Sequence, residues 1–201
     1  MNQEQKKPFS QACENNKQPI LDVISEYFKN GVILEVGSGT GQHAMFFAEH
    51  MRHIYWQTSD RVENLPGINV WLNAYTHYNL GRPMILDVNQ DNWPMSAVDG
   101  VFTANTLHIM NWSSVEELFH RAAEILRVGG YFCAYGPVNI DGEFTSESNR
   151  AFDAKLRDEN PSMGIRDLDD LKTLGEKNNL NFINLHRMPA NNVTMIWQKQ
   201  A

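Results

Sequence analysis

The residues best suited to chemistry form the segment EVGSGTG at positions 35–41. It follows a short, β-branched apolar run, residues 32–36, of the kind that is buried on both faces in a parallel sheet. Three glycines at alternate positions allow the backbone to turn sharply and to approach a ligand without intervening side chains. We therefore expect a ligand-binding loop here, and the alternative is a tight turn without a ligand. The loop residues expected to contact the ligand are Gly37, Ser38, Gly39 and Gly41.

Three acidic residues accompany this loop. Glu35 lies inside the first expected strand, where a buried carboxylate costs several kcal/mol unless a group such as a ligand cation compensates it. Asp60 ends the second strand and is placed to accept both hydroxyls of a ribose, although it could instead cap the next helix. Asp87 ends the third strand, where it suits an adenine amine beside the backbone N–H of Val88; a turn with Asn89 is the alternative. The expected ligand carries an adenosine and a positive charge.

The glycine spacing distinguishes this loop from phosphate-binding loops. A dinucleotide-binding loop has the pattern G-x-G-x-x-G, whereas the third glycine here comes one residue early and Gln42 occupies its place. No Lys-Ser or Lys-Thr pair completes a nucleoside triphosphate loop. A nicotinamide oxidoreductase is therefore disfavoured, and tight binding of NAD would favour it again.

The elements that must position these residues alternate along the chain. Helical spacing of apolar residues predicts helices at 20–28, 44–51, 68–75, 113–127, 147–158 and 168–174. Apolar runs predict strands at 32–36, 54–59, 83–88, 98–105, 131–135, 181–187 and 193–199, the last two pairing antiparallel. This order predicts an α/β fold with a doubly wound, mostly parallel sheet and a C-terminal antiparallel strand pair. Ligands bind at the carboxyl ends of the strands in such sheets.

Capping residues predict where several helices begin. Pro19 suits the first turn of the first helix. Ser113 and Glu116 have the spacing of a capping box at the start of the fourth. Asp167 is expected to cap the helix that carries Leu168.

The combined pattern resembles the class I S-adenosylmethionine-dependent methyltransferases. The residues that carry this resemblance are ILEVGSGTG at 33–41, Asp60, ILD at 85–87, the strand 98–105 and LRVGG at 126–130. In that family the glycine loop wraps the methionine part, two strand-end acids hold ribose and adenine, and the end of strand four holds the amino acid. The resemblance implies these roles, in that order, for Gly37, Gly39 and Gly41, for Asp60, for Asp87 with Val88, and for Asn105.

A narrower resemblance spans nearly the whole chain. It rests on ENNKQPI at 14–20, YGP at 135–137, FDAKLR at 152–157, GIRD at 164–167 and MPANN at 188–192. These phrases are similar to a small methyltransferase-like family of unknown function. The similarity supplies no substrate.

Two histidines are candidates for roles at the site. His108 follows the fourth strand, near the expected position of the transferable methyl group, where a neutral imidazole can take a proton from the acceptor. The alternative for His108 is a positioning or capping role. His43, just past the glycine loop, could contact the cofactor carboxylate or equally face solvent.

The chain is expected to form a single domain over residues 1–201, with two segments closing over the site. Residues 1–17 are the expected N-terminal lid, and 136–166 the expected acceptor-side insertion, because loops at strand ends carry specificity. Arg166 could clamp a carboxylate or phosphate, or pair with Asp167 or another acid. The acceptor-side residues expected are Asn16, Tyr135, Asn149, Arg166 and Asp167.

The function expected is methyl transfer from S-adenosylmethionine, which leaves S-adenosylhomocysteine, to a small-molecule acceptor. The runner-up is a non-catalytic S-adenosylmethionine-binding protein with a regulatory or scaffold role. The chain has 17 Lys and Arg against 24 Asp and Glu, a net charge of −7, which disfavours a nucleic-acid partner. With two cysteines and no carboxylate-supported histidine pair we expect no metal. No apolar run approaches about 18 residues and no signal peptide is visible, which predicts a cytoplasmic protein without a membrane partner.

Overall fold

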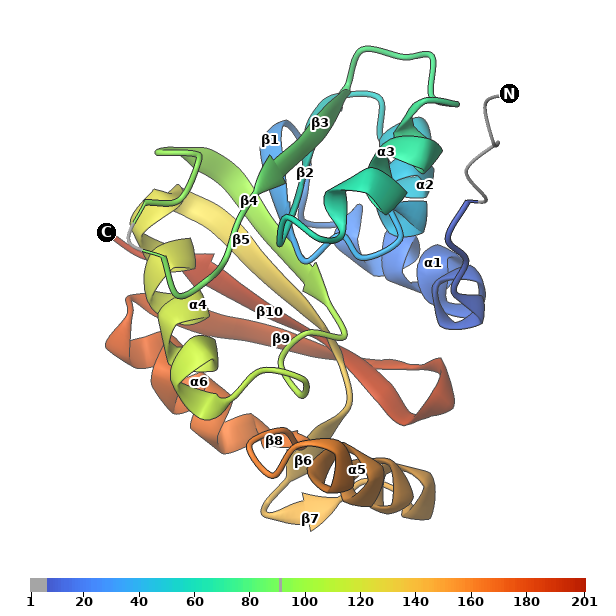
Figure 1. Cartoon of the computed structure of the whole chain (residues 1–201). Coiled ribbons are helices and arrows are strands. Elements are labelled where there is room, and N and C mark those ends of the chain that lie inside the picture. The colour runs from blue at the N-terminus through green and yellow to red at the C-terminus, as the bar shows by residue number, and fades with distance from the viewer. Residues whose placement is uncertain (1–6, 91) are drawn as a thin grey trace.

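The computed structural model describes residues 7–90 and 92–201, and its centre is a seven-stranded sheet in the order β3-β2-β1-β4-β5-β10-β9 (Figure 1). The first five strands run parallel, and β10 is antiparallel to both of its neighbours. The doubly wound α/β fold with a C-terminal antiparallel pair is thereby confirmed. The strands are β1 (Gly31–Val36), β2 (Ile54–Asp60), β3 (Leu80–Ile85), β4 (Val98–Ala104), β5 (Leu126–Gly136), β9 (Leu180–Met188) and β10 (Asn192–Lys199).

Helices cover both faces of this sheet (Figure 1). One face carries α1 (Gln11–Ile24), α2 (Gln42–His50) and α3 (Leu65–Leu72), and the other carries α4 (Trp112–Ile125) and α6 (Leu168–Lys177). Each face has its own apolar core, around Phe47 and Trp56 on the first side and around Phe119 and Trp197 on the second. Burial of these large side chains supplies most of the driving force that holds helices against strands.

The segment after β5 forms a small unit of its own. It consists of β6 (Val138–Ile140), β7 (Glu143–Phe144), α5 (Glu147–Glu159) and β8 (Arg166–Asp167). The three short strands pair in the order β7-β6-β8, and α5 lies beside them at the end of the molecule where β5 finishes (Figure 1). The strands β9 and β10 are joined by the 3-10 turn η1 (Pro189–Asn191).

Two of the predicted helix starts are wrong. The helix α1 begins at Gln11, where the Ser10 hydroxyl caps it, so Pro19 lies well inside the helix. The polar residues of its first turns concealed the helical spacing. The helix α4 is capped by Asn111, whose side chain accepts from the backbone N–H of Ser114, and not by a Ser113–Glu116 box. Asp167 caps α6 as predicted.

The first six residues of the expected N-terminal lid lie outside the described part of the chain. Most of the remainder of that lid, 11–17, is the first half of α1. No helix within residues 7–90 and 92–201 combines the length and apolarity that a membrane crossing requires.

Candidate functional site

A cavity of about 580 Å³ lies at the carboxyl ends of the parallel strands. Residues from the ends of β1, β2 and β4 and from the turn after β3 line it, as expected for a ligand site in an open α/β sheet. Six of the ten residues predicted to bind the cofactor are among the lining residues: Gly37, Gly39, Asp60, Asp87, Val88 and Asn105.

Left-handed backbone shapes the floor of this cavity. Gly37 has φ 77° and Gly39 has φ 58°, a region that side chains disfavour. A Cβ atom at Gly37 would lie 2.8 Å from Cγ2 of Thr106, whereas one at Gly39 would meet nothing within 4 Å. Asn105, at the end of β4, also has φ 59°. Asparagine tolerates this conformation better than most side chains, at a cost on the order of 1 kcal/mol.

Asp60 connects the glycine loop to the second strand. One carboxylate oxygen, Oδ2, accepts from the backbone N–H of Gly39 at 2.7 Å. The other, Oδ1, accepts from the N–H of Arg61 at 2.7 Å and from Nδ2 of Asn64 at 2.8 Å. A carboxylate offers about four acceptor positions, so one remains, and the bond from the exposed Asn64 side chain is replaceable by a ligand hydroxyl.

Asp87 forms the turn that was the alternative for this residue. Its Oδ1 accepts from both the backbone N–H and the side-chain amide of Asn89, at 3.0 and 3.1 Å. Both residues line the cavity, together with Val88. The turn therefore fixes the carboxylate at the cavity wall and does not remove it from the site.

Glu35 and Ser38 lie behind the loop instead of lining the cavity. The Ser38 hydroxyl and the Trp56 indole N–H donate to the Glu35 carboxylate at 2.8 and 3.1 Å. Burial raises the pKa of Glu35 to about 7, against these hydrogen bonds and with a smaller contribution from the charge of Asp60. Two neutral donors thus offset only part of the cost of burying this charge, for which the sequence had suggested a cationic ligand. Gly41 also lies away from the cavity, packed against the backbone of Ile68.

His43 belongs to a buried polar cluster under α1. Its Nε2 lies 2.7 Å from Oδ1 of Asn16, and its ring stacks on Phe47. Burial lowers the pKa of His43 to about 4, so the ring is neutral at pH 7 and does not face solvent. Tyr135 joins this cluster through side-chain hydrogen bonds with Asn16 and Asn192, which partly oppose the rise that burial causes in its pKa.

His108 is buried next to the cavity without lining it within the described residues. Its ring packs edge-on against Phe152 with centroids 5.2 Å apart. Burial, and then the charge of Arg166, lower the pKa of His108 to about 4. The imidazole is therefore neutral at pH 7, but it is a weaker proton acceptor than an ordinary histidine.

The remaining acceptor-side candidates hold the insertion together. Arg166 donates to backbone carbonyl oxygens and does not pair with Asp167. Asp167 accepts from the backbone N–H groups of Gly142 and Asp169. Asn149 donates to the Thr145 hydroxyl and to the carbonyl of Asn191, both at 2.9 Å. Their proposed role toward an acceptor stays a prediction.

One wall of the cavity was not predicted from the sequence. Asn160, Ser162 and Met163, in the turn between α5 and β8, line it opposite the strand ends. The insertion was expected on the acceptor side only, yet this turn reaches the predicted cofactor cavity. Nothing in the polar stretch around 160–163 distinguishes these residues from an ordinary surface turn.

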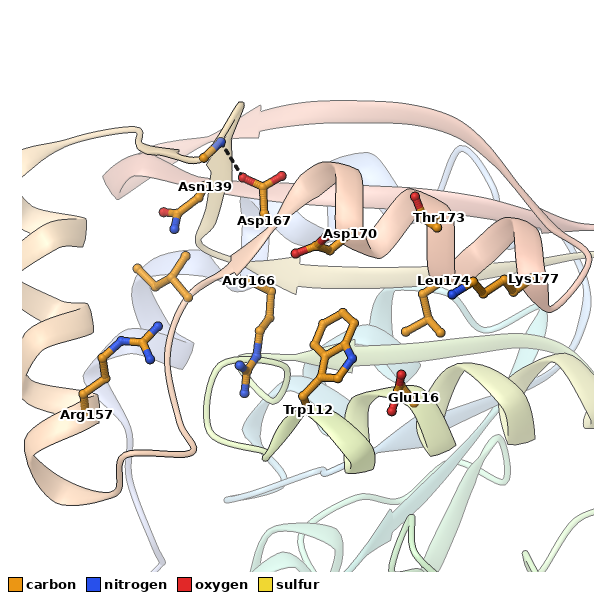
Figure 2. A pocket seen from close by; sticks show the side chains of 12 residues that line it. Trp112, Glu116, Asn139, Arg157, Arg166, Asp167, Asp170, Thr173, Leu174 and Lys177 are labelled. Atoms are coloured by element: carbon orange, nitrogen blue, oxygen red, sulfur yellow. Dashed lines mark hydrogen bonds between the residues drawn. The ribbon is translucent and has the colours of Figure 1, made fainter.

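A second cavity, of about 590 Å³, lies between α4, α6 and the insertion; we call it the α4–α6 groove. Figure 2 shows Trp112 in its middle, with Arg166 on one side and Glu116 on the other. Asp170 and Lys177 enter from α6, and the insertion contributes Arg157 (Figure 2). Arg166 and Asp167 therefore line this groove and not the cavity at the strand ends.

A family model described as "Protein of unknown function (DUF938)" matches residues 7–199, nearly the whole chain. The chain belongs to this family. The narrower of the two resemblances in the sequence is thereby confirmed, and the family description names no reaction.

In fold, the DUF938 chain is similar to solved methyltransferase structures. An O-methyltransferase family protein from Burkholderia thailandensis superposes with a TM-score of 0.81 at 16% identity, covering 94% of this chain and 58% of its own. An O-methyltransferase family 2 protein from Planctomyces limnophilus, in complex with apigenin, gives 0.79 at 15% identity, covering 94% and 60%. Human N-acetylserotonin methyltransferase in complex with SAM gives 0.77 at 14% identity, covering 94% and 53%. The chain thus spans little more than half the length of these proteins.

Proposed function

We propose that this DUF938 protein transfers a methyl group from S-adenosylmethionine to a small-molecule acceptor. The observation that carries the proposal is the cavity at the strand ends, where bare glycine backbone is joined by the carboxylate that ends β2 and the one in the turn after the adjacent β3. The methyltransferase fold of the solved neighbours supports the same reaction class.

The residues present fit S-adenosylmethionine. Gly37 and Gly39 leave room for the methionine part beside Asn105 at the end of β4. Asp60 retains an acceptor position for a ribose hydroxyl, and Asp87, with the backbone of Val88, would hold the adenine edge. When bound, the cofactor supplies an activated methyl group on a sulfonium, an excellent leaving group.

The chain's own contribution is mainly alignment and exclusion of water. Direct displacement breaks the carbon–sulfur bond as the acceptor atom bonds to the methyl carbon, so holding the two in line supplies much of the acceleration. If the acceptor atom carries a proton, His108 is the candidate to accept it, because its imidazole is neutral at pH 7. Asn16, Tyr135 and Asn149 remain the proposed acceptor-side polar groups.

The charge of the chain favours a small acceptor. A net charge of −7 opposes the release of counterions that drives binding to a nucleic-acid backbone. Small, neutral or cationic molecules face no such opposition. A methyl-transfer assay with a labelled methyl group and pooled metabolites is the corresponding screen, and a labelled nucleic acid would contradict this acceptor class.

Calorimetry with S-adenosylhomocysteine tests the cofactor assignment. Wild type is expected to release heat, and Asp60→Ala to bind about 100-fold more weakly, because one charged acceptor and the loop contact to Gly39 are lost. Asp22→Ala, which changes an exposed acid of α1, is the matched control and should bind as wild type does. Thermal unfolding of each variant verifies that it is folded.

The possible outcomes of this experiment lead to different conclusions. No heat with wild type would contradict the proposal. Undiminished binding by Asp60→Ala would contradict the ribose assignment. Binding without transfer to any acceptor, together with unchanged cellular function of His108→Ala, would leave the non-catalytic binding protein.

A further inference from the structure

The Arg166 side chain joins two turns that are far apart in the sequence. Its Nε donates to the carbonyl oxygen of Leu107 at 3.1 Å. Its Nη2 donates to the carbonyl oxygen of Met110 and, at 3.1 Å, to that of Ser162. One guanidinium therefore holds the turn that follows β4 and the turn that precedes β8.

Both of these turns line the cavity at the strand ends. The first contributes Ile109, Met110 and Asn111, and the second contributes Ser162 and Met163. Arg166 itself lies behind them and lines the α4–α6 groove on the other side (Figure 2). The side chain thus acts from outside the cavity on two parts of its wall.

The chemistry of arginine suits this connection. A guanidinium is planar and presents five N–H donors in a fixed fork, whereas a lysine ammonium is a single point charge on a flexible stem. In Arg166, two nitrogens of this fixed fork hold three carbonyl oxygens from two turns at once. The backbone link from Gly164 N–H to the carbonyl of His108, at 2.9 Å, runs between the same two segments and keeps them in register.

We propose that Arg166 is a positioning residue for the cofactor, which holds the 107–110 and 160–163 turns together as one wall of the cavity. The proposal rests on the proposed function, because it takes S-adenosylmethionine as the ligand of that cavity. If Arg166 has this role, cofactor affinity depends on how the insertion packs against the turn after β4. The segment expected on the acceptor side then also helps to bind the cofactor.

Calorimetry with S-adenosylhomocysteine on Arg166→Met tests this proposal. The affinity is expected to fall about tenfold, because the wall must be ordered by the ligand in the absence of the guanidinium. Arg166→Lys, which restores the charge without the fork, should recover only part of the loss. Arg150→Met removes another arginine of the insertion, which is exposed on α5, and should bind as wild type does.

Hydrogen exchange separates positioning from general stability. Amides of 107–110 and 160–164 should exchange faster in Arg166→Met, and addition of S-adenosylhomocysteine should slow them again, while exchange in β1 and β4 stays unchanged. Arg166→Lys gives the same comparison if Arg166→Met does not fold.

The possible failures are distinct. If wild type binds no S-adenosylhomocysteine, the proposed function itself is contradicted. If wild type binds and both Arg166 variants bind equally tightly, the positioning role is overturned while the cofactor assignment stands. If Arg166→Lys recovered the full affinity, the positive charge alone would explain the effect, and the positioning role of the guanidinium would be contradicted.

Discussion

The cavity at the strand ends and the α4–α6 groove have nearly the same volume, about 580 and 590 Å³. They are built in different ways. The first combines left-handed backbone at Gly37, Gly39 and Asn105 with carboxylates fixed at the ends of strands. The second is lined mostly by side chains of helices and of the insertion, with charges of both signs such as Glu116 on α4 and Asp170 and Lys177 on α6.

This difference shows that volume does not identify a binding site. The first cavity brings glycine backbone and hydrogen-bonded carboxylates to the carboxyl ends of parallel strands, which is where ligands bind in open α/β sheets. Exposed side chains of both signs along two helices are what any solvated groove between helices presents. We therefore propose the cavity at the strand ends, and not the α4–α6 groove, as the cofactor site.

The largest expected effect lies behind the glycine loop, at Glu35. The folded state holds this carboxyl with a pKa of about 7 against an ordinary value of 4.5. Because the folded pKa is raised, the folded state binds the proton more tightly, and wild-type stability falls as the pH rises from 4.5 through 7. Relative to Glu35→Gln, wild type should lose about 3 kcal/mol of unfolding free energy over that range.

Urea unfolding at pH 5 and pH 8 measures this difference. Glu35→Gln retains an oxygen that accepts from Ser38 and Trp56, so its own stability should vary less with pH. If the stability of both proteins changed with pH in the same way, burial would not raise the pKa of Glu35, and no destabilising buried charge would lie behind the glycine loop.

A smaller effect is expected from the glycine backbone itself. Gly37→Ala places a methyl group 2.8 Å from Cγ2 of Thr106 at a positive φ, whereas Gly39→Ala meets open space. Both substitutions should cost about 1–2 kcal/mol of conformational strain. Only Gly37→Ala must also displace Thr106, which lines the cavity, so its S-adenosylhomocysteine affinity should fall about tenfold further than that of Gly39→Ala.

Calorimetry with S-adenosylhomocysteine on this pair, with urea unfolding as a stability control, shows whether affinity falls because of backbone strain alone or also because of the contact with Thr106. Equal affinities for the two variants would show that the close approach at Thr106 does not shape the cavity.

The smallest effect is expected in the α4–α6 groove. Asp170→Asn changes an exposed carboxylate that lines it and should alter S-adenosylhomocysteine affinity less than about twofold, as is usual for surface substitutions. Calorimetry beside wild type measures it. A loss comparable to that of Asp60→Ala would break the distinction between the two cavities.

The order of strands and helices was predictable because apolar periodicity reports it directly. The positions of Asp60 and Asp87 followed, since the carboxyl ends of parallel strands share one edge of a sheet. The start of α1 was not predictable from periodicity, because residues 11–15 are mostly polar and their helix is fixed by the Ser10 cap and by contacts to Gln42. Sequence patterns within a segment predict its structure poorly where the residues that stabilise it lie far away in the sequence.

The sequence by itself determined the strand-end loop, the two acids beside it and the class of fold that places them together. Only the tertiary structure decided that Glu35 accepts from Trp56 of the neighbouring strand, that His43 pairs with Asn16 of α1, and that Arg166 ties the insertion to the turn after β4. The physical reason is the same in each case. A buried polar group must find a partner, and which partner lies within hydrogen-bonding distance is set by how the elements pack, and residue types along the chain do not record it.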